Sequence, residues 1–328
     1  MPHQIRSLAI IAVGLLLISC VLQQPTPPES KQPKPTPPPI ESRSDTGWQT
    51  GLSMPVARSE MAAATLDARI YVPGGFGGES IFSSYIPATD SWQTLADIPQ
   101  GRHHLMTAAH AEYIYVFGGA PSGTWRPTTN TWRYDPATNS WTEMAPMPEG
   151  RVAGAAVTMD DAIYVVGGIG GQNSLLRYDI GTNSWTKRTG PAVIREHLAA
   201  VSLDGKLYVL GGRWRSQGEF SSIEIYDPAQ DLWTSGPNMQ EARAGFGATV
   251  LNGRIWVAGG ELISGRLESL ASVEVFDSDE QRWSYGPELP FALHGVPLTA
   301  ADGAIYLLGG SDAAGAIENQ GRVLSYRP

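Results

Sequence analysis

The sequence predicts an all-β protein, a six-bladed β-propeller whose blades each contain four antiparallel strands. Two observations carry this prediction. Six Gly-Gly pairs recur at spacings of 44, 49, 44, 48 and 50 residues, and six tryptophans recur at the same spacings. Two unrelated residue types that share one uneven period indicate a repeat architecture. The pairs begin at Gly74, Gly118, Gly167, Gly211, Gly259 and Gly309, and the tryptophans are Trp48, Trp92, Trp141, Trp185, Trp233 and Trp283.

Each repeat contains signals for four strands. A short apolar segment such as residues 115–117 precedes the glycines, which is typical of a buried strand. Seven residues before the first glycine, five repeats place a turn-forming Asp or Asn, and in three of them Gly follows, which favours a tight hairpin. A third strand after the glycines ends in an aromatic residue, and the tryptophan of the fourth strand follows seven residues later.

The two ends of the repeat region complement each other. The last repeat stops after Tyr326 without a tryptophan strand, whereas Trp48 precedes the first complete repeat. We therefore expect an N-terminal strand around Trp48 to complete the last blade and close the ring. Closure would leave only short and protected strand edges.

The glycine pair, the aromatic residue, the tryptophan and a recurrent Met/Ile-Pro-x-x-Arg resemble the kelch repeat over residues 48–328. The resemblance implies a propeller of the galactose oxidase and kelch superfamily. It implies no single function, because kelch propellers include both enzymes and binding platforms. The Tyr–Cys radical chemistry of galactose oxidase is excluded, because the only cysteine, Cys20, precedes the repeats.

The first 46 residues predict export. Residues 1–19 resemble a signal peptide, with an apolar run too short to span a bilayer. Leu17-Ile18-Ser19-Cys20 resembles the bacterial lipoprotein box, which implies lipid attachment at Cys20; an ordinary secretory signal is the alternative. Residues 20–46 then form a Pro-rich linker and residues 47–328 the propeller. The expected location is the extracytoplasmic side of a bacterial envelope.

A set of repeat arginines is predicted on the face that carries the loops after the glycine pairs. These side chains either brace neighbouring blades or bind an anionic ligand, and the sequence leaves both roles open. One arginine follows each of five tryptophans by ten residues, and His294 stands one residue later in the sixth repeat. The set is Arg58, Arg102, Arg151, Arg195, Arg243 and His294.

Ionisable and aromatic residues near these arginines complete the candidate site. The ligand-binding candidates are His103, Trp125, Arg126, Trp214 and Arg215, alongside the repeat arginines; Arg213 and Arg266 also lie in loops that follow glycine pairs. The candidate acid–base groups of an enzyme are Glu60, His104, Glu196 and His197. The His and Glu residues lack a recognisable metal-ligand spacing, so the sequence predicts neither a metal nor a cofactor.

Two functions remain open. The first is an envelope-anchored platform that binds a glycan or a protein, with an anionic ligand expected from the arginines. The second is a carbohydrate-active enzyme similar in architecture to the bacterial kelch propellers that interconvert sialic-acid anomers. The formal net charge of −9 argues against nucleic-acid binding.

Overall fold

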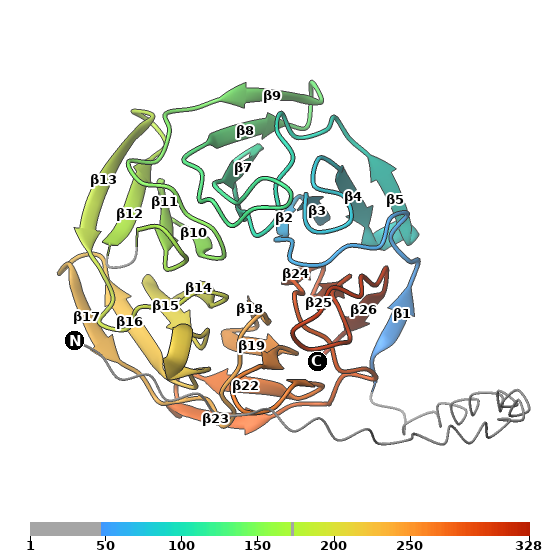
Figure 1. The fold of residues 1–328 in the computed structure, drawn as a ribbon, viewed down its shortest axis with the longest axis vertical. Coiled ribbons are helices and arrows are strands. Elements are labelled where there is room, and N and C mark those ends of the chain that lie inside the picture. Colours follow the sequence, from blue (N-terminus) through green and yellow to red (C-terminus); the bar gives the residue numbers. More distant parts are fainter. Residues whose placement is uncertain (1–46, 172–173) are drawn as a thin grey trace, which may run out of the picture. The chain divides into compact units, whose positions relative to one another are not determined.

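The computed structural model describes residues 47–171 and 174–328, and it confirms the predicted propeller (Figure 1). These residues form six four-stranded antiparallel sheets arranged as blades around a central axis. The predicted signal peptide, Cys20 and Pro-rich linker lie outside the described residues. Within the described residues there is no helix long and apolar enough to cross a membrane.

The blades follow one another along the chain, and in the first five the innermost strand comes first (Figure 1). Blades one to three are β2–β5 (Ala64–Leu66, Arg69–Pro73, Phe82–Ile86, Ser91–Thr94), β6–β9 (Met106–His110, Tyr113–Phe117, Thr131–Asp135, Ser140–Glu143) and β10–β13 (Ala155–Met159, Ala162–Val166, Ser174–Asp179, Ser184–Thr189). Blades four and five are β14–β17 (Ala199–Leu203, Lys206–Leu210, Ile223–Asp227, Leu232–Ser235) and β18, β19, β22, β23 (Gly247–Leu251, Arg254–Ala258, Val273–Asp277, Arg282–Tyr285). Blade six is β24 (Leu298–Ala301), β25 (Ala304–Leu308), β26 (Val323–Tyr326) and β1 (Gln49–Gly51).

Three short elements lie outside the blades. They are the 3₁₀ turns η1 (Pro87–Thr89) and η2 (Arg215–Gln217) and the small hairpin of β20 (Glu261–Leu262) and β21 (Glu268–Ser269). This hairpin and η2 belong to the post-glycine loops, which we define as the segments between each glycine pair and the third strand of its blade. The post-glycine loops share one face of the propeller, here called the loop face. The hairpin turns lie at the opposite end of the strands.

A closed ring of backbone hydrogen bonds joins all six blades around the axis. Each blade contributes one residue that lies shortly before its innermost strand. The N–H of this residue donates to the carbonyl of the equivalent residue in the preceding blade, over 2.6 to 3.0 Å. All six residues have positive φ, between 51° and 61°. We call this set the inner ring; its members are Glu60, His104, Ala153, His197, Gly245 and Gly295.

The glycine pairs form a second cycle of contacts between blades. The second glycine of each pair donates to a carbonyl of the next blade, as Gly75 donates to Arg102 over 3.0 Å. At Gly74 the backbone approaches so closely that a Cβ would lie 2.4 Å from the Arg102 carbonyl oxygen, and φ is +59°. Only glycine fits both constraints, which explains the repeated pair.

The six periodic tryptophans form an outer cycle. Each indole N–H donates to a backbone carbonyl of the preceding blade over 2.7 to 2.9 Å, as Trp141 does to Ala96 and Trp283 to Pro237. The apolar faces of neighbouring blades pack between these cycles, for example Tyr71 and Phe82 of blade one against Val116 of blade two. The glycine pairs and tryptophans that repeat along the sequence are therefore the residues that make the contacts between blades.

The strand β1 is the outer strand of blade six. It pairs with β26 in antiparallel register, with Gln49 opposite Ser325 and Gly51 opposite Val323. Trp48 donates its indole N–H to the carbonyl of Pro287 in blade five over 2.9 Å and lies against Tyr326, with ring centroids 5.5 Å apart. The segment thus joins the first residues of the propeller to the last blade.

Deletion of residues through Gly51 should lower the melting temperature and expose the edge of β26 to self-association. Deletion of residues 21–44, which removes none of these contacts, should leave the melting temperature unchanged. Thermal unfolding and size-exclusion chromatography of both deletions check the expectation. Equal melting temperatures would show that β1 contributes nothing to the stability of the ring.

Candidate functional site

A cavity of about 160 Å³ lies on the propeller axis. Its walls come from the inner ring and from the small side chains that follow it in every blade, such as Ala63, Ala156 and Ala248. Because these positions are equivalent in all blades, their side chains face a common centre. The chemistry at this centre is therefore set by whichever residues occupy the inner ring.

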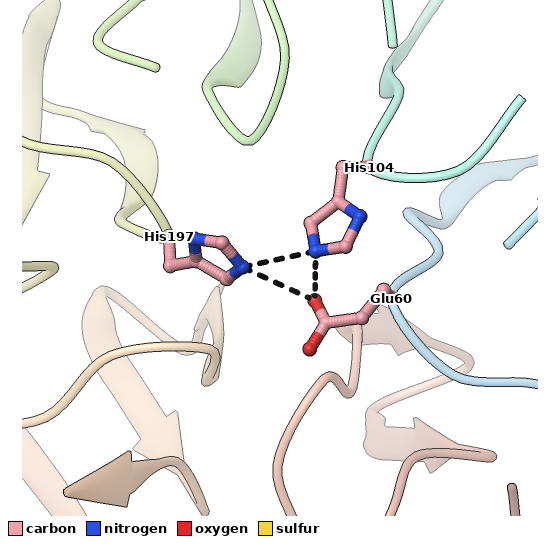
Figure 2. A group of neighbouring side chains, drawn as sticks. All are labelled: Glu60, His104 and His197. Atoms are coloured by element: carbon pink, nitrogen blue, oxygen red, sulfur yellow. Dashed lines mark hydrogen bonds and ion pairs between the residues drawn. The ribbon is translucent and has the colours of Figure 1, made fainter. Parts of the chain in front are cut away.

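Three inner-ring side chains from blades one, two and four meet at the axis (Figure 2). His104 Nε2 lies 3.1 Å from Glu60 Oε2 and 2.9 Å from His197 Nε2. His197 Nε2 lies 3.8 Å from the same Glu60 oxygen. The three side chains are 12% exposed or less, and this compact polar cluster lines a cavity whose other side chains are apolar except for Thr107.

Small residues at the other inner-ring positions provide the space for this cluster. Ala153 and Gly245 have no functional group to place on the axis. At Gly295 a Cβ would lie 2.7 Å from Glu60 Oε1, and φ is +61°. The carboxylate of Glu60 therefore occupies space that the glycine of blade six leaves free.

A surrounding set of polar residues holds the two histidines. His104 Nδ1 lies 2.7 Å from His103 Nδ1, and His103 Nε2 lies 3.0 Å from the carbonyl oxygen of Thr124. His197 Nδ1 contacts Glu196 Oε2 directly. Both imidazoles are thus held through Nδ1, and both present Nε2 to the axis.

Glu196 belongs to a further network on the loop face. Arg213 donates from Nε to Glu196 Oε1 over 2.8 Å and from Nη1 to Glu261. Glu261 Oε2 also lies 3.5 Å from His294 Nε2. Glu261 was not among the predicted site residues. It and Arg213 directly follow the glycine pairs of their blades, but the residue type at this position differs from blade to blade, so the repeat does not indicate the pair.

Burial and charge act together on these groups. Burial by itself would raise the pKa of Glu60, but the neighbouring His104, His197 and His294 outweigh it, so the pKa falls far below its usual range. Burial lowers the pKa of His197 strongly, and the positive charge of Arg213 adds to this effect. Burial also lowers the pKa of His103. The surroundings therefore favour the ionised form of Glu60, and burial favours the neutral forms of His103 and His197.

The repeat arginines lie inside the blades rather than at the channel mouth. Arg58, Arg151, Arg195 and Arg243 are at most 1% exposed. Each donates to the carbonyl of the first glycine of its own blade over 2.7 to 2.9 Å. Most of their remaining bonds go to the third strand or the residues just before it, and Arg243 donates to Glu274 Oε1 over 2.7 Å. The four arginines therefore brace the interior of their own blades, whereas the sequence had left open a role between neighbouring blades.

Two repeats depart from the arginine pattern. Arg102 binds the carbonyl of Gly101 and the side chains of Gln100 and Asn130, and it lies over the ring of Trp132. In blade six the equivalent position is Leu293, which is fully buried. His294 instead matches the residue after each arginine, because it bridges to Ser311 as His103 bridges to Ala120.

The predicted loop residues lie at the surface. Trp125 is 50% exposed, and its ring centroid is 4.7 Å from that of His104. Trp214 lies in the post-glycine loop of blade four. The Cζ atom of Arg215 lies over its ring, 4.9 Å from the ring centroid. Arg126 and Arg215 are exposed, and neither has an acidic partner among the residues that the structure describes. Arg266 pairs with Glu268.

Replacement of Arg243 by alanine should lower the free energy of unfolding by about 3–5 kcal/mol, because it leaves the fully buried Glu274 carboxylate without its partner. Arg266→Ala is the control; it breaks an exposed pair and should cost at most about 1 kcal/mol. Chemical denaturation measures both. Similar losses for the two variants would argue against bracing.

Comparisons with known proteins agree with this architecture. Kelch-like protein terF of Aspergillus terreus (strain NIH 2624 / FGSC A1156) is 36% identical over 88 residues, 23% of this chain and 19% of that protein. Kelch repeat and BTB domain-containing protein 1 of Vaccinia virus (strain Copenhagen) is 29% identical over 101 residues, 28% of this chain and 18% of that protein. The chain thus spans about a fifth of the length of these relatives.

A solved structure described as "Structure of YjhT" superposes with a TM-score of 0.73 over 83% of this chain and 96% of that one, at 18% identity, and supports the fold. The family model of the Attractin/LZTR1 beta-propeller matches residues 70–316. Since this match covers well over half of the sequence, the chain belongs to the Attractin/LZTR1 beta-propeller family and is a kelch-type propeller.

Proposed function

We propose that this propeller is a binding platform whose loop face docks an acidic partner, most simply an acidic surface of another protein. Kelch propellers typically serve as protein-interaction platforms, which supports the general function. The observation that carries the proposal is the exposure of large apolar side chains on the post-glycine loops. Exposed apolar groups gathered on one surface are typical of interaction sites.

Four large exposed apolar side chains belong to these loops: Trp125, Ile263, Leu267 and Ile317. Leu267 is 74% exposed and Ile317 56% exposed. The loops of blades five and six touch, because Leu267 and Ile263 both lie within 4 Å of the place that a Cβ on Gly315 would occupy. The apolar surface is therefore shared between neighbouring blades.

The unpaired arginines favour an acidic partner. Arg126 stands beside Trp125, and Arg215 covers Trp214. Tryptophan and arginine are the residues that most often dominate the binding energy of protein interfaces. A guanidinium group also binds a carboxylate through two parallel hydrogen bonds. A carboxylated glycan offers the same chemistry and is a second outcome of the test.

The alternative of a carbohydrate-active enzyme has less support. The structure brings its four candidate acid–base groups together, but they are nearly enclosed and bonded to one another. An acid–base pair must reach the reacting atoms of its substrate. The four groups are Glu60, His104, Glu196 and His197.

An array of acidic, neutral and basic peptides, together with carboxylated and neutral glycans, tests the proposal. Acidic peptides should bind best, with an affinity that falls as salt rises. Trp125→Ala and Arg215→Glu should each weaken binding by about tenfold or more, as interface hot spots do. Arg282→Glu is the matched control, because Arg282 is an exposed arginine on the opposite face.

Three results would contradict the proposal: a preference for basic peptides, a preference for neutral glycans, or an equal loss of binding in the Arg282→Glu control. If only carboxylated glycans bind, the loop face recognises an acidic ligand as proposed, but the ligand is a glycan and not a protein.

We further propose that the platform is exported and held at a bacterial envelope by a lipid on Cys20. The Cys20→Ser variant should leave the membrane fraction or fail to mature, because a thioether-linked lipid requires that sulfur. Fractionation followed by immunoblotting measures this. Unchanged membrane association of the variant would exclude lipid attachment at Cys20.

A further inference from the structure

The hydrogen bonds around the axial cluster determine which nitrogen of each histidine carries a proton. The carbonyl oxygen of Thr124 can only accept, so His103 Nε2 carries a hydrogen. His103 Nδ1 lies 2.7 Å from His104 Nδ1, so this contact occupies the Nδ1 side of His104. His104 Nε2 therefore faces the axis, where it is available as a ligand atom.

The same reasoning applies to His197. The carboxylate of Glu196 can only accept, so His197 Nδ1 carries the hydrogen. His197 Nε2 then faces the axis as a second ligand atom. It lies 2.9 Å from His104 Nε2, and the carboxylate of Glu60 completes the group. Three possible ligand atoms thus surround one point, and a cation between them would bind all three.

The distances and the ligand types fit a metal ion. Bonds of about 2.0–2.1 Å in a tetrahedral site place neighbouring ligand atoms about 3.3 Å apart. The three separations here are 2.9, 3.1 and 3.8 Å. Two imidazoles and one carboxylate are the ligand set of open zinc sites, and imidazole suits zinc and its neighbours in the first transition series.

We propose that Glu60, His104 and His197 bind a divalent transition-metal ion, most simply Zn²⁺, on the axis of the propeller. Glu196 holds His197 from behind and His103 holds His104, as outer residues orient imidazole ligands in metal proteins. The three ligands line the axial cavity, so a fourth coordination position faces it and takes a water molecule. The site goes beyond the proposed docking function and does not depend on it.

His294 is adjacent but separate from this ligand set. Its Nε2 lies 3.9 Å from Glu60 Oε1 and 3.5 Å from Glu261 Oε2. Its buried Nδ1 has no hydrogen-bond partner within the described residues. We therefore place His294 beside the ion as a neighbour of Glu60 and not as one of the three ligands.

The full chain, without an affinity tag and stripped with a chelator, should take up one equivalent of Zn²⁺, measured by titration calorimetry and by elemental analysis after dialysis. Zn²⁺ should also raise its melting temperature. Co²⁺ should replace Zn²⁺ and produce the visible absorption of a tetrahedral site. A stripped protein that takes up less than a tenth of an equivalent would overturn the proposal and indicate a shared proton instead.

Variants locate the ion. His104→Ala and His197→Ala should abolish uptake, and Glu196→Gln, which keeps all three ligands, should weaken it by about 10–100-fold. His110→Ala is the control, because His110 ends β6 near the hairpin turn, at the far end of the inner strand. Uptake in the two ligand variants equal to that of the wild type would overturn the assignment. If these variants fail to fold, the stoichiometry of the wild type and the affinity of Glu196→Gln decide.

Discussion

The inner ring is the constraint on which the rest of this structure depends. Six backbone N–H groups and six carbonyls meet at the axis, where no strand pairing can satisfy them, and a buried unpaired group is costly. The cyclic arrangement pairs every one of them with a neighbouring blade. It requires a left-handed backbone at each of the six positions, which fixes the direction in which each inner-ring side chain points.

That backbone gives a reason to regard the axial cluster as functional. Glycine adopts the left-handed conformation without strain, and blades five and six use it. Glu60, His104 and His197 adopt the same conformation at an energetic cost of order 1 kcal/mol each. Four inner-ring residues other than glycine bear this strain; at Ala153 no functional group accompanies it, and at the other three positions the functional groups meet.

The fold could be predicted from the sequence because the residues that repeat are those that make contacts between blades. The glycine pair marks a place where a Cβ would meet a carbonyl oxygen, and each tryptophan marks a hydrogen bond to the preceding blade. The convergence of Glu60, His104 and His197 was also visible as ionisable residues at equivalent positions. Their suitability as metal ligands was not visible, because ligands that come from three separate blades form no short metal-binding motif in the sequence.

The roles of the arginines could not be settled from the sequence. A repeat position shows that an arginine recurs, but it does not show whether the side chain points into its blade or toward the propeller axis. The structure shows that Arg58 and Arg243 point into their blades. The substitution of Leu293 at the sixth position shifted the apparent register by one residue and placed His294 in the wrong set. Glu261 and Arg213 follow the glycine pairs at one repeat position, but the residue type there changes between blades, so the period does not indicate that they pair.

The direction of β1 decides on which face of the propeller its first described residues lie. Gln49 lies opposite Ser325 and Gly51 opposite Val323, so β1 runs from the hairpin-turn end of blade six toward the loop face. Trp48, which leads into β1, therefore lies at the end of the strands opposite the post-glycine loops. Because β26 runs in the opposite direction, Tyr326 lies on that same side, so both described ends of the propeller lie away from the loop face that carries Trp125 and Arg215.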